Sequence, residues 1–115
     1  MDVEKIFKAL GDPLRLKILM LLPKSPSLRD FKDGLNVNQI VEELSGTQPN
    51  ISHHLKILRE AELIRQEKVR NNIFYYRDAE TMKYVRDYLD KLADSRWIDP
   101  GTTSPEALPE PDDNP

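Results

Sequence analysis

The chain has 115 residues, which is enough for one compact domain with a single hydrophobic core and too short for two. It contains no cysteine, which excludes disulfides and thiolate metal sites, and no apolar run approaches the ~20 residues of a transmembrane helix. The acidic start does not resemble a secretory signal, so we expect a cytoplasmic protein with no membrane partner.

The net charge of -3 is unevenly distributed along the chain. Residues 99–115 hold five acidic side chains, no Lys or Arg, and five of the nine prolines. Residues 1–98 therefore carry 17 basic and 15 acidic side chains, a net charge of +2. We expect a mildly basic folded domain over residues 1–96, followed by an acidic, proline-rich and disordered tail over residues 97–115.

Two helices are predicted at the start of the chain. Asp2 can cap a helix over residues 3–10, which places Val3, Ile6, Phe7 and Leu10 on one face. Asp12-Pro13 begins a second helix that runs to Leu22, because proline is tolerated at the first helical position. The nearly continuous apolar run of this second helix predicts a central, heavily buried element, with inward positions at Leu14, Ile18, Leu21 and Leu22.

Residues 23–34 form a connector that could contact a ligand, a partner or DNA, although we favour a tolerated insertion. Two further helices follow it. Asn36 begins the third helix and has Gln39 at capping-box spacing, and Ser45-Gly46 ends it. Thr47 caps the fourth helix, which ends near Ala61-Glu62. Its inward residues are Ile51, Leu55 and Leu58.

The apolar period then changes from about 3.6 to 2 residues, which indicates strands. Residues 63–69 and 73–77 are predicted to form a hairpin joined at Arg70-Asn71-Asn72, because asparagine tolerates the positive φ of a tight turn. Asp78 caps a last helix over residues 79–94. The order of four helices, a hairpin and a helix predicts a mainly α fold, the winged helix-turn-helix.

The fourth helix and the hairpin carry the candidate DNA-binding residues. Short polar side chains on the exposed face of the helix can read the mixed donors and acceptors of base edges, and the helix N-terminus can hold a phosphate. Basic side chains of the helix and hairpin can reach the DNA backbone. The candidates are Thr47, Gln48, Asn50, Ser52, His53, Lys56, Arg65, Lys68, Arg70 and Asn71.

Some of these residues also have ordinary structural explanations. Thr47 alone is explained by helix capping, and Glu67 among the hairpin bases fits an ordinary solvated hairpin. His53 and His54 point about 100° apart on a helix, so they cannot share one metal ion. We interpret His53 as a DNA-facing donor and His54 as a partly buried packing residue.

Apolar faces on both terminal helices exceed what one small core can absorb, which predicts a homodimer. Its interface is expected at Val3, Ile6, Phe7, Leu10, Met82, Val85, Leu89 and Leu92. Two recognition helices would then lie about 34–36 Å apart and read an inverted repeat.

Two stretches resemble a known family. Residues 7–19, which contain Gly11-Asp12-Pro13, resemble the opening of ArsR/SmtB-type repressors, and residues 48–64 resemble their recognition helix even more closely. Tyr75-Tyr76 matches the second wing strand, and the resemblance covers about residues 3–93. It implies a homodimer built from the first and last helices, which binds double-stranded operator DNA near its own gene and is released by an effector.

The chain departs from the metal-sensing members of this family. Asn36-Val37-Asn38 stands where arsenic- and cadmium-type members have Cys-Val-Cys, and neutral amides cannot replace thiolates for soft metals. The last helix has no His for the zinc and nickel site. We therefore expect no metal and no cofactor, which leaves either a small organic effector or no effector at all.

Two other function classes compete with DNA binding. A winged-helix module that binds protein would need apolar residues on the exposed face of the fourth helix, where Gln48, Asn50 and Ser52 lie instead. An enzyme would need a phosphate-binding loop, a nucleophile with its base, or metal-ligand spacing, and none is present. The sequence therefore predicts a regulator, with repression as the family's usual mode of action.

Overall fold

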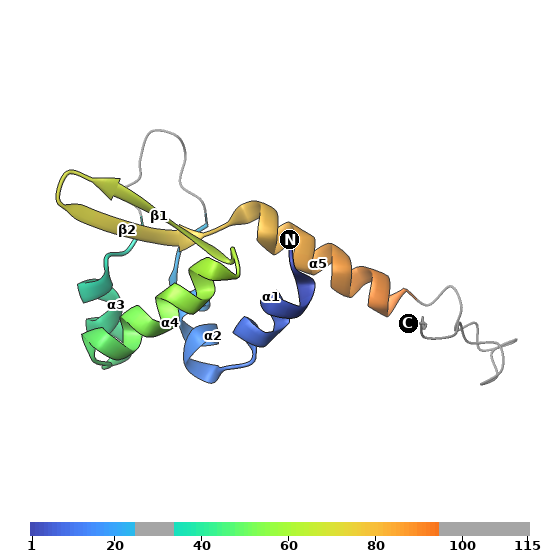
Figure 1. The fold of residues 1–115 in the computed structure, drawn as a ribbon, viewed down its shortest axis with the longest axis horizontal. Helices are drawn as coiled ribbons and strands as arrows, with labels where there is room; N and C mark the ends of the chain where they lie inside the picture. Colours follow the sequence, from blue (N-terminus) through green and yellow to red (C-terminus); the bar gives the residue numbers. More distant parts are fainter. Residues whose placement is uncertain (25–33, 95–115) are drawn as a thin grey trace, which may run out of the picture. The chain divides into compact units, whose positions relative to one another are not determined.

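A computed structural model describes residues 1–24 and 34–94, and within these ranges the order of elements confirms the predicted fold (Figure 1). The helices are α1 (Val3–Leu10), α2 (Pro13–Leu21), α3 (Val37–Leu44), α4 (Gln48–Glu60) and α5 (Ala79–Ala93), and the strands β1 (Ile64–Val69) and β2 (Asn72–Arg77) precede α5. The predicted tail and most of the connector lie outside the described residues.

Side-chain caps start the helices, as the sequence predicts. Asn36 and Gln39 form a complete capping box, with both hydrogen bonds at 2.8 Å. Because the first N–H groups of a helix have no partner within it, each cap contributes about 0.5–2 kcal/mol and sets where the helix begins. The other caps are Asp2 on α1, Asp12 on α2, Thr47 on α4 and Asp78 on α5.

The core is formed by apolar side chains from α1, α2, α3, α4 and the start of β1. Ile6 belongs to this core and is completely buried within the single chain. Its side chain therefore has no surface to offer a second copy, which corrects its assignment to the dimer interface. The other fully buried large apolar side chains are Ile18, Leu22, Ile40, Ile51, Leu55, Leu58, Leu63 and Ile64.

The prediction that α2 is heavily buried is wrong for one side of the helix. Leu16 and Met20 are 46% and 80% exposed, while Ile18 and Leu19 are buried. A continuous apolar run places apolar residues around the whole circumference of a helix, but α1, α3 and α4 contact only part of it. Leu16 and Met20 line an open apolar groove beside Leu44 of α3.

The hairpin is antiparallel, and its register differs by one residue from the prediction. Val69 pairs with Asn72, which leaves Arg70 and Asn71 as a two-residue loop. The positive φ, 59°, occurs at Arg70 and not at an asparagine, which corrects the predicted turn. In two-residue hairpin loops of the favoured types the first loop residue needs a positive φ, whatever residue stands there.

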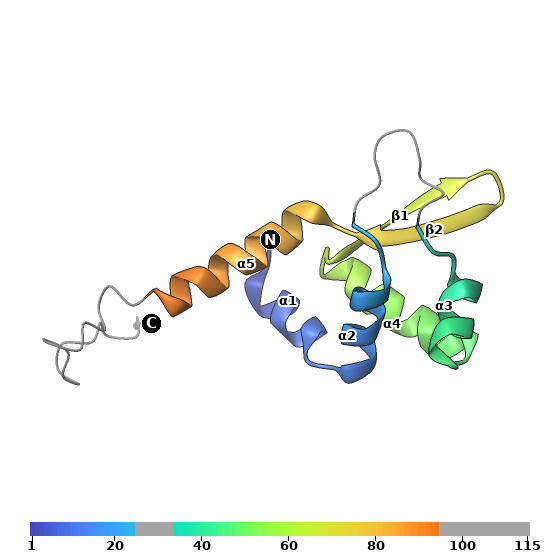
Figure 2. The same ribbon diagram turned by 180° about the vertical axis from the view of Figure 1, so that it is seen from behind.

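The free edge of β2 holds both ends of the connector (Figure 2). Leu35 and Tyr75 exchange two backbone hydrogen bonds, of 3.1 and 2.8 Å, and the Arg77 N–H donates to the Pro23 carbonyl at 2.7 Å. A Cβ at Gly34 would lie 2.7 Å from the Tyr75 carbonyl oxygen, so only glycine allows this approach without a shift. These contacts tie the hairpin to the helices, and sequence patterns gave no sign of them.

The chain divides into two compact units, Met1–Val85 and Arg86–Pro115. The first part of α5 belongs to the first unit, where Thr81 is buried and Met82 and Val85 pack against the core. In the second unit, Leu89 and Leu92 are 47% and 61% exposed. None of the helices in the described ranges is long and apolar enough to cross a membrane.

Candidate nucleic-acid interface

A tight turn joins α3 to α4 and sets the position of α4. Ser45 adopts a left-handed conformation with φ 53°, and the Gly46 N–H donates to the Val41 carbonyl at 3.0 Å. A Cβ at Gly46 would lie 3.2 Å from the Ile51 side chain, so the small residue allows α4 to start close to the turn. Thr47 then caps α4, with its hydroxyl oxygen 3.4 Å from the Asn50 N–H.

Helix α4 has one buried face and one polar exposed face. Ile51, Leu55 and Leu58 are each at most 2% exposed and pack into the core. Because these three anchors fix the rotation of the helix about its axis, the opposite face is presented to solvent. The polar residues predicted to read DNA are all exposed on this helix and its cap: Thr47, Gln48, Asn50, Ser52, His53 and Lys56.

The start of α4 offers fewer backbone donors than the sequence suggested. Pro49 has no N–H, and the Asn50 N–H is engaged by Thr47. Among the first three residues of α4 this leaves Gln48 to donate to a phosphate. A phosphate at this helix end would therefore depend on side chains more than on the backbone.

The hairpin residues are also exposed, but they do not share one face. Successive side chains of a strand alternate between faces, so Arg65 and Lys68, three positions apart in β1, point to opposite sides. Arg70 and Asn71 lie in the loop at the hairpin tip. The sequence predicts one basic group from these four residues, whereas the structure separates Arg65 from the tip.

Arg65 has a partner at the base of the hairpin. Its Nη1 lies 3.7 Å from the Asp78 Oδ2, and the same carboxylate caps α5 through Oδ1, which accepts from the Thr81 N–H at 2.9 Å. Since the Arg65 side chain is 64% exposed, this ion pair adds at most about 1 kcal/mol. Arg65 therefore has a structural role that does not require DNA.

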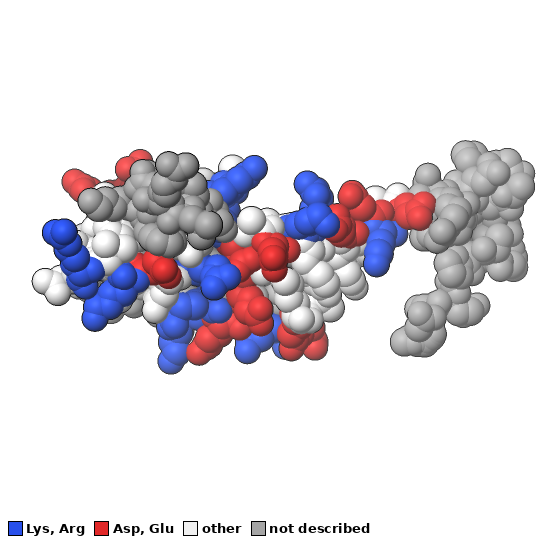
Figure 3. All heavy atoms as spheres, turned by 90° about the horizontal axis from the view of Figure 1, so that it is seen from above, with Lys and Arg blue, Asp and Glu red and all other residues white. Residues whose placement is uncertain are grey.

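Positive charge is concentrated in the segment that forms α4 and the hairpin. Residues 47–77 carry six basic and three acidic side chains, a net charge of +3, whereas the whole chain has -3. Seen from above, blue side chains lie at the end of the molecule that the hairpin tip occupies in Figure 1, with acidic side chains among them (Figure 3). Such a local field attracts a polyanion although the whole chain is acidic.

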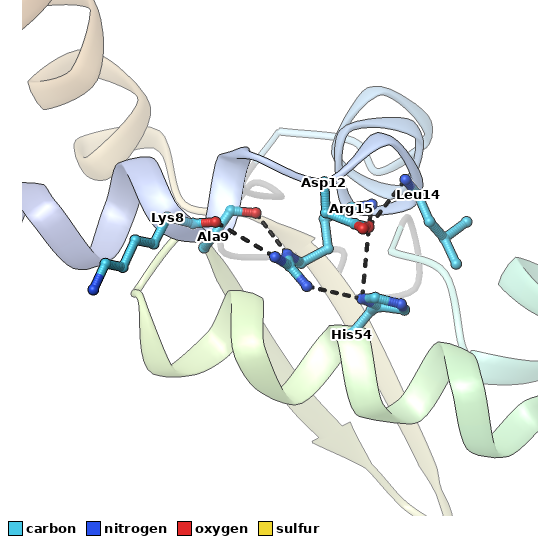
Figure 4. Close-up of polar contacts among 6 residues, drawn as sticks. All are labelled: Lys8, Ala9, Asp12, Leu14, Arg15 and His54. Atoms are coloured by element: carbon cyan, nitrogen blue, oxygen red, sulfur yellow. Dashed lines mark hydrogen bonds and ion pairs between the residues drawn. The ribbon is translucent and has the colours of Figure 1, made fainter.

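A polar cluster behind the exposed face of α4 was missed by sequence reasoning (Figure 4). His54 Nδ1 lies 3.1 Å from Arg15 Nη1 and 3.8 Å from Asp12 Oδ2. The His54 side chain is 13% exposed, in agreement with its predicted partial burial. It also makes a polar contact with Arg15. The partners are 39 residues apart, so no local spacing could reveal the contact.

The cluster shifts the pKa values of two of its members. Hydrogen bonds from backbone N–H groups, led by that of Arg15, lower the pKa of Asp12. Burial lowers the pKa of His54, and Arg15 and His53 act in the same direction, while Asp12 opposes them. The lowered pKa favours the neutral form of His54 at pH 7.

The described residues contain no group of three His, Asp or Glu side chains close enough to hold a metal ion. At the start of α3, where Asn36 and Asn38 stand, the Asn36 amide oxygen already accepts the Gln39 N–H of the capping box. At that position the Asn36 side chain therefore serves the start of the helix.

Known proteins similar to this chain share its fold and sequence pattern. A sequence model described as bacterial regulatory protein, arsR family, matches residues 12–66. An HTH-type transcriptional regulator of Methanocaldococcus jannaschii is 40% identical over 88 residues, 76% of this chain and 91% of the relative. The arsenical resistance operon repressor of Staphylococcus xylosus is 33% identical over 89 residues, which cover 77% and 78% of the two chains.

A solved structure has the same fold. It is the solution structure of a homodimeric winged helix-turn-helix DNA-binding domain from Mycobacterium bovis, with a TM-score of 0.59 and 22% identity. The match covers 81% of this chain and 79% of that one.

Proposed function

Because the chain belongs to the ArsR family of DNA-binding transcriptional regulators, we propose that it is a homodimeric repressor that reads a specific operator with α4. The observation that carries this proposal is the division of α4 into a buried apolar face and an exposed polar face. Gln48, Asn50, Ser52 and His53 are the proposed base-reading residues, because their short side chains match the donors and acceptors of the major groove.

The basic side chains are proposed to contact phosphates. Arg70 and Asn71 at the hairpin tip, with Lys68 beside them, extend from the domain and can follow the backbone next to the groove that α4 enters. Lys56 lies farther along α4 and adds to the same field. Arg65 contributes charge from the base of the hairpin, where Asp78 partly neutralises it.

Dimerisation is supported by apolar surface that one copy leaves uncovered. Leu89 and Leu92 on α5 are exposed, and Val3, Phe7 and Leu10 on α1 are only partly buried. We propose that these residues, with Met82 and Val85, form the interface with a second copy. The M. bovis domain of the same fold is a homodimer. A two-fold axis between two α4 helices then predicts an operator with inverted-repeat symmetry.

The effector is proposed to be something other than a metal ion. The chain has no cysteine at the start of α3 or elsewhere, and α5 carries no histidine. The ligand types that transition metals prefer are therefore missing from both α3 and α5. Release from DNA then depends on a small organic effector or, without an effector, on a partner or on the amount of protein. Calorimetric titration with zinc and nickel at pH 7 checks this, and tight binding of either ion would contradict it.

Selection of bound duplexes from a random pool, followed by fluorescence anisotropy, tests the main proposal. We expect one preferred duplex with inverted-repeat symmetry that binds more tightly than its scrambled version. Raising the salt from 50 to 200 mM should weaken binding to both duplexes, because phosphate contacts release counterions. If no duplex is enriched or bound, the chain is instead a winged-helix module that binds protein.

A further inference from the structure

The Arg15 guanidinium joins three segments of the chain at one point (Figure 4). Its Nε donates to the Ala9 carbonyl at 2.7 Å and its Nη2 to the Lys8 carbonyl at 3.4 Å, near the C-terminal end of α1. Its Nη1 lies 3.1 Å from Nδ1 of His54 on α4. A cation at a helix C-terminus is favourable, and only the planar fork of arginine can make all three contacts.

This geometry fixes the tautomer of His54. A guanidinium has only donors, so Nδ1 of His54 must accept, and the single ring proton of the neutral form is on Nε2. A proton on Nδ1 would place a donor and a positive charge against Arg15. The remaining partner would then be Asp12, whose Oδ2 is 3.8 Å away.

The groups around His54 shift its pKa in both directions. Asp12 faces it from the turn between α1 and α2, and Arg15 faces it from the first turn of α2. His53, on the same helix as His54, has its ring centroid 5.3 Å away. Burial lowers the pKa of His54 more than Asp12 raises it, and Arg15 and His53 lower it further. The Arg15 contact is therefore complete well above pH 6.5, and it is lost as the pH falls through the lowered pKa.

We propose that Arg15 and neutral His54 are positioning residues for DNA reading, which hold α4 at a fixed orientation against the turn between α1 and α2. The inference rests on the proposed function, since orientation matters only if α4 reads bases. His54 is adjacent to His53 and four residues after Asn50, so any shift of its backbone reaches two of the proposed reading residues directly. Protonation of His54 breaks the contact and loosens the reading face without changing the phosphate-binding residues.

Substitutions separate this role from simple stabilisation. Arg15→Lys keeps the charge but loses the three-way contact, and we expect roughly tenfold weaker binding to the selected duplex at pH 7.5, with binding to its scrambled version within about twofold. His54→Asn places an amide oxygen near the position of Nδ1 and cannot be protonated, so it should bind like the wild type. His54→Leu removes the acceptor and should behave like Arg15→Lys.

The pH profile provides a readout that a purely structural role would not change. All proteins in this comparison carry His53→Gln, which leaves His54 as the one histidine of the sequence, and the duplex is selected anew with this protein because His53 is a proposed base-reading residue. In that background, the ratio of selected to scrambled affinity should fall as the pH is lowered from 7.5 through the lowered pKa of His54, and should stay constant over the same range with His54→Asn. Equal losses on both duplexes for Arg15→Lys, or the same pH profile with and without His54, would overturn the proposal.

Nuclear magnetic resonance of the imidazole nitrogens in the free protein tests the contact without DNA. We expect Nδ1 of His54 to be unprotonated at pH 7.5 and to titrate below 6.5, the ordinary value for histidine. A protonated Nδ1 at pH 7.5 would overturn this inference and leave the proposed function intact. Absence of any preferred duplex for the wild type would overturn both.

Discussion

Helix α4 and the β1–β2 hairpin present their polar side chains in different ways. The side chains of α4 lie opposite a buried face held by Ile51, Leu55 and Leu58, so burial alone determines which side meets solvent. The hairpin exposes residues on both faces. The basic side chains of Arg65 and Lys68 point to opposite sides, and Arg70 lies at the tip. On a half-buried helix, the positions of the polar residues therefore show which face is exposed. On a hairpin exposed on both faces, they show only where charged side chains occur.

The two regions also differ in how they are held. Helix α4 contacts α1, α2, α3 and β1, and Arg15 adds a polar contact at His54. The hairpin is fixed through the outer edge of β2, by Leu35 and the Pro23 carbonyl, while its tip extends beyond these contacts. We therefore expect α4 to control specificity and the hairpin tip to control affinity.

Leu55→Ala should give the largest effect, because it removes an anchor of the buried face of α4. The side chain is 2% exposed, and truncation in such a site costs about 2–5 kcal/mol of unfolding free energy. Denaturant unfolding measures the loss. Ser52→Ala on the exposed face is the matched control and should stay within about 0.5 kcal/mol of the wild type. Similar losses for both would contradict the two-faced description of α4.

Ser52→Ala should reduce discrimination between the selected and the scrambled duplex. Losing one base contact costs roughly 1–3 kcal/mol on the correct sequence and little on a random one, because only the correct base offers a partner. Anisotropy titrations of both duplexes at one salt concentration give the ratio. If Ser52→Ala weakens binding to both duplexes equally, the residue does not read bases.

Arg70→Ala should weaken binding to both duplexes by a similar factor. A phosphate contact carries no sequence information, so its loss appears as a flatter salt dependence, by about 0.9 in the log–log slope. Titrations at four salt concentrations measure this slope. An unchanged slope would mean that the hairpin tip does not meet the DNA backbone.

Arg65→Ala should give the smallest effect on DNA binding, although it removes the same charge as Arg70→Ala. Its partner Asp78 lies 3.7 Å away at the hairpin base, and loss of the exposed pair costs at most about 1 kcal/mol of stability. Comparing the salt slopes of the two variants shows whether the base of the hairpin or its tip contacts the DNA backbone. A larger slope change for Arg65→Ala would reverse the assignment within the hairpin.

Local signals in the sequence were enough to predict most elements and the exposed polar face of α4. Caps at Asp12, Asn36 and Thr47 act within three residues, and the apolar period of α4 identifies its inward side. Both are properties of neighbouring residues, which a pattern can show. The predicted contacts of individual residues with DNA remain predictions.

The structural features that the sequence patterns did not predict depend on contacts between different segments of the chain. The apolar run of α2 cannot tell which side its neighbours cover, so the exposure of Leu16 and Met20 was missed. The Arg15–His54 contact spans 39 residues. The positive φ at Arg70 follows from the strand register, which is itself set by pairing across the hairpin. In each case the deciding partner lies on another segment of the chain, so the residue's own local pattern does not reveal the contact.

The anchoring of Pro23 and Leu35 on β2 also has a consequence for protein engineering. Their partners, Arg77 and Tyr75, are two residues apart on one strand, so Pro23 and Leu35 contact the fold at nearly the same place. Each doubling of the intervening length then costs only about 0.6 kcal/mol of closure entropy. We therefore expect that an affinity tag inserted between Lys24 and Gly34 leaves the contacts of Pro23 and Leu35 with β2, and the position of α4, unchanged.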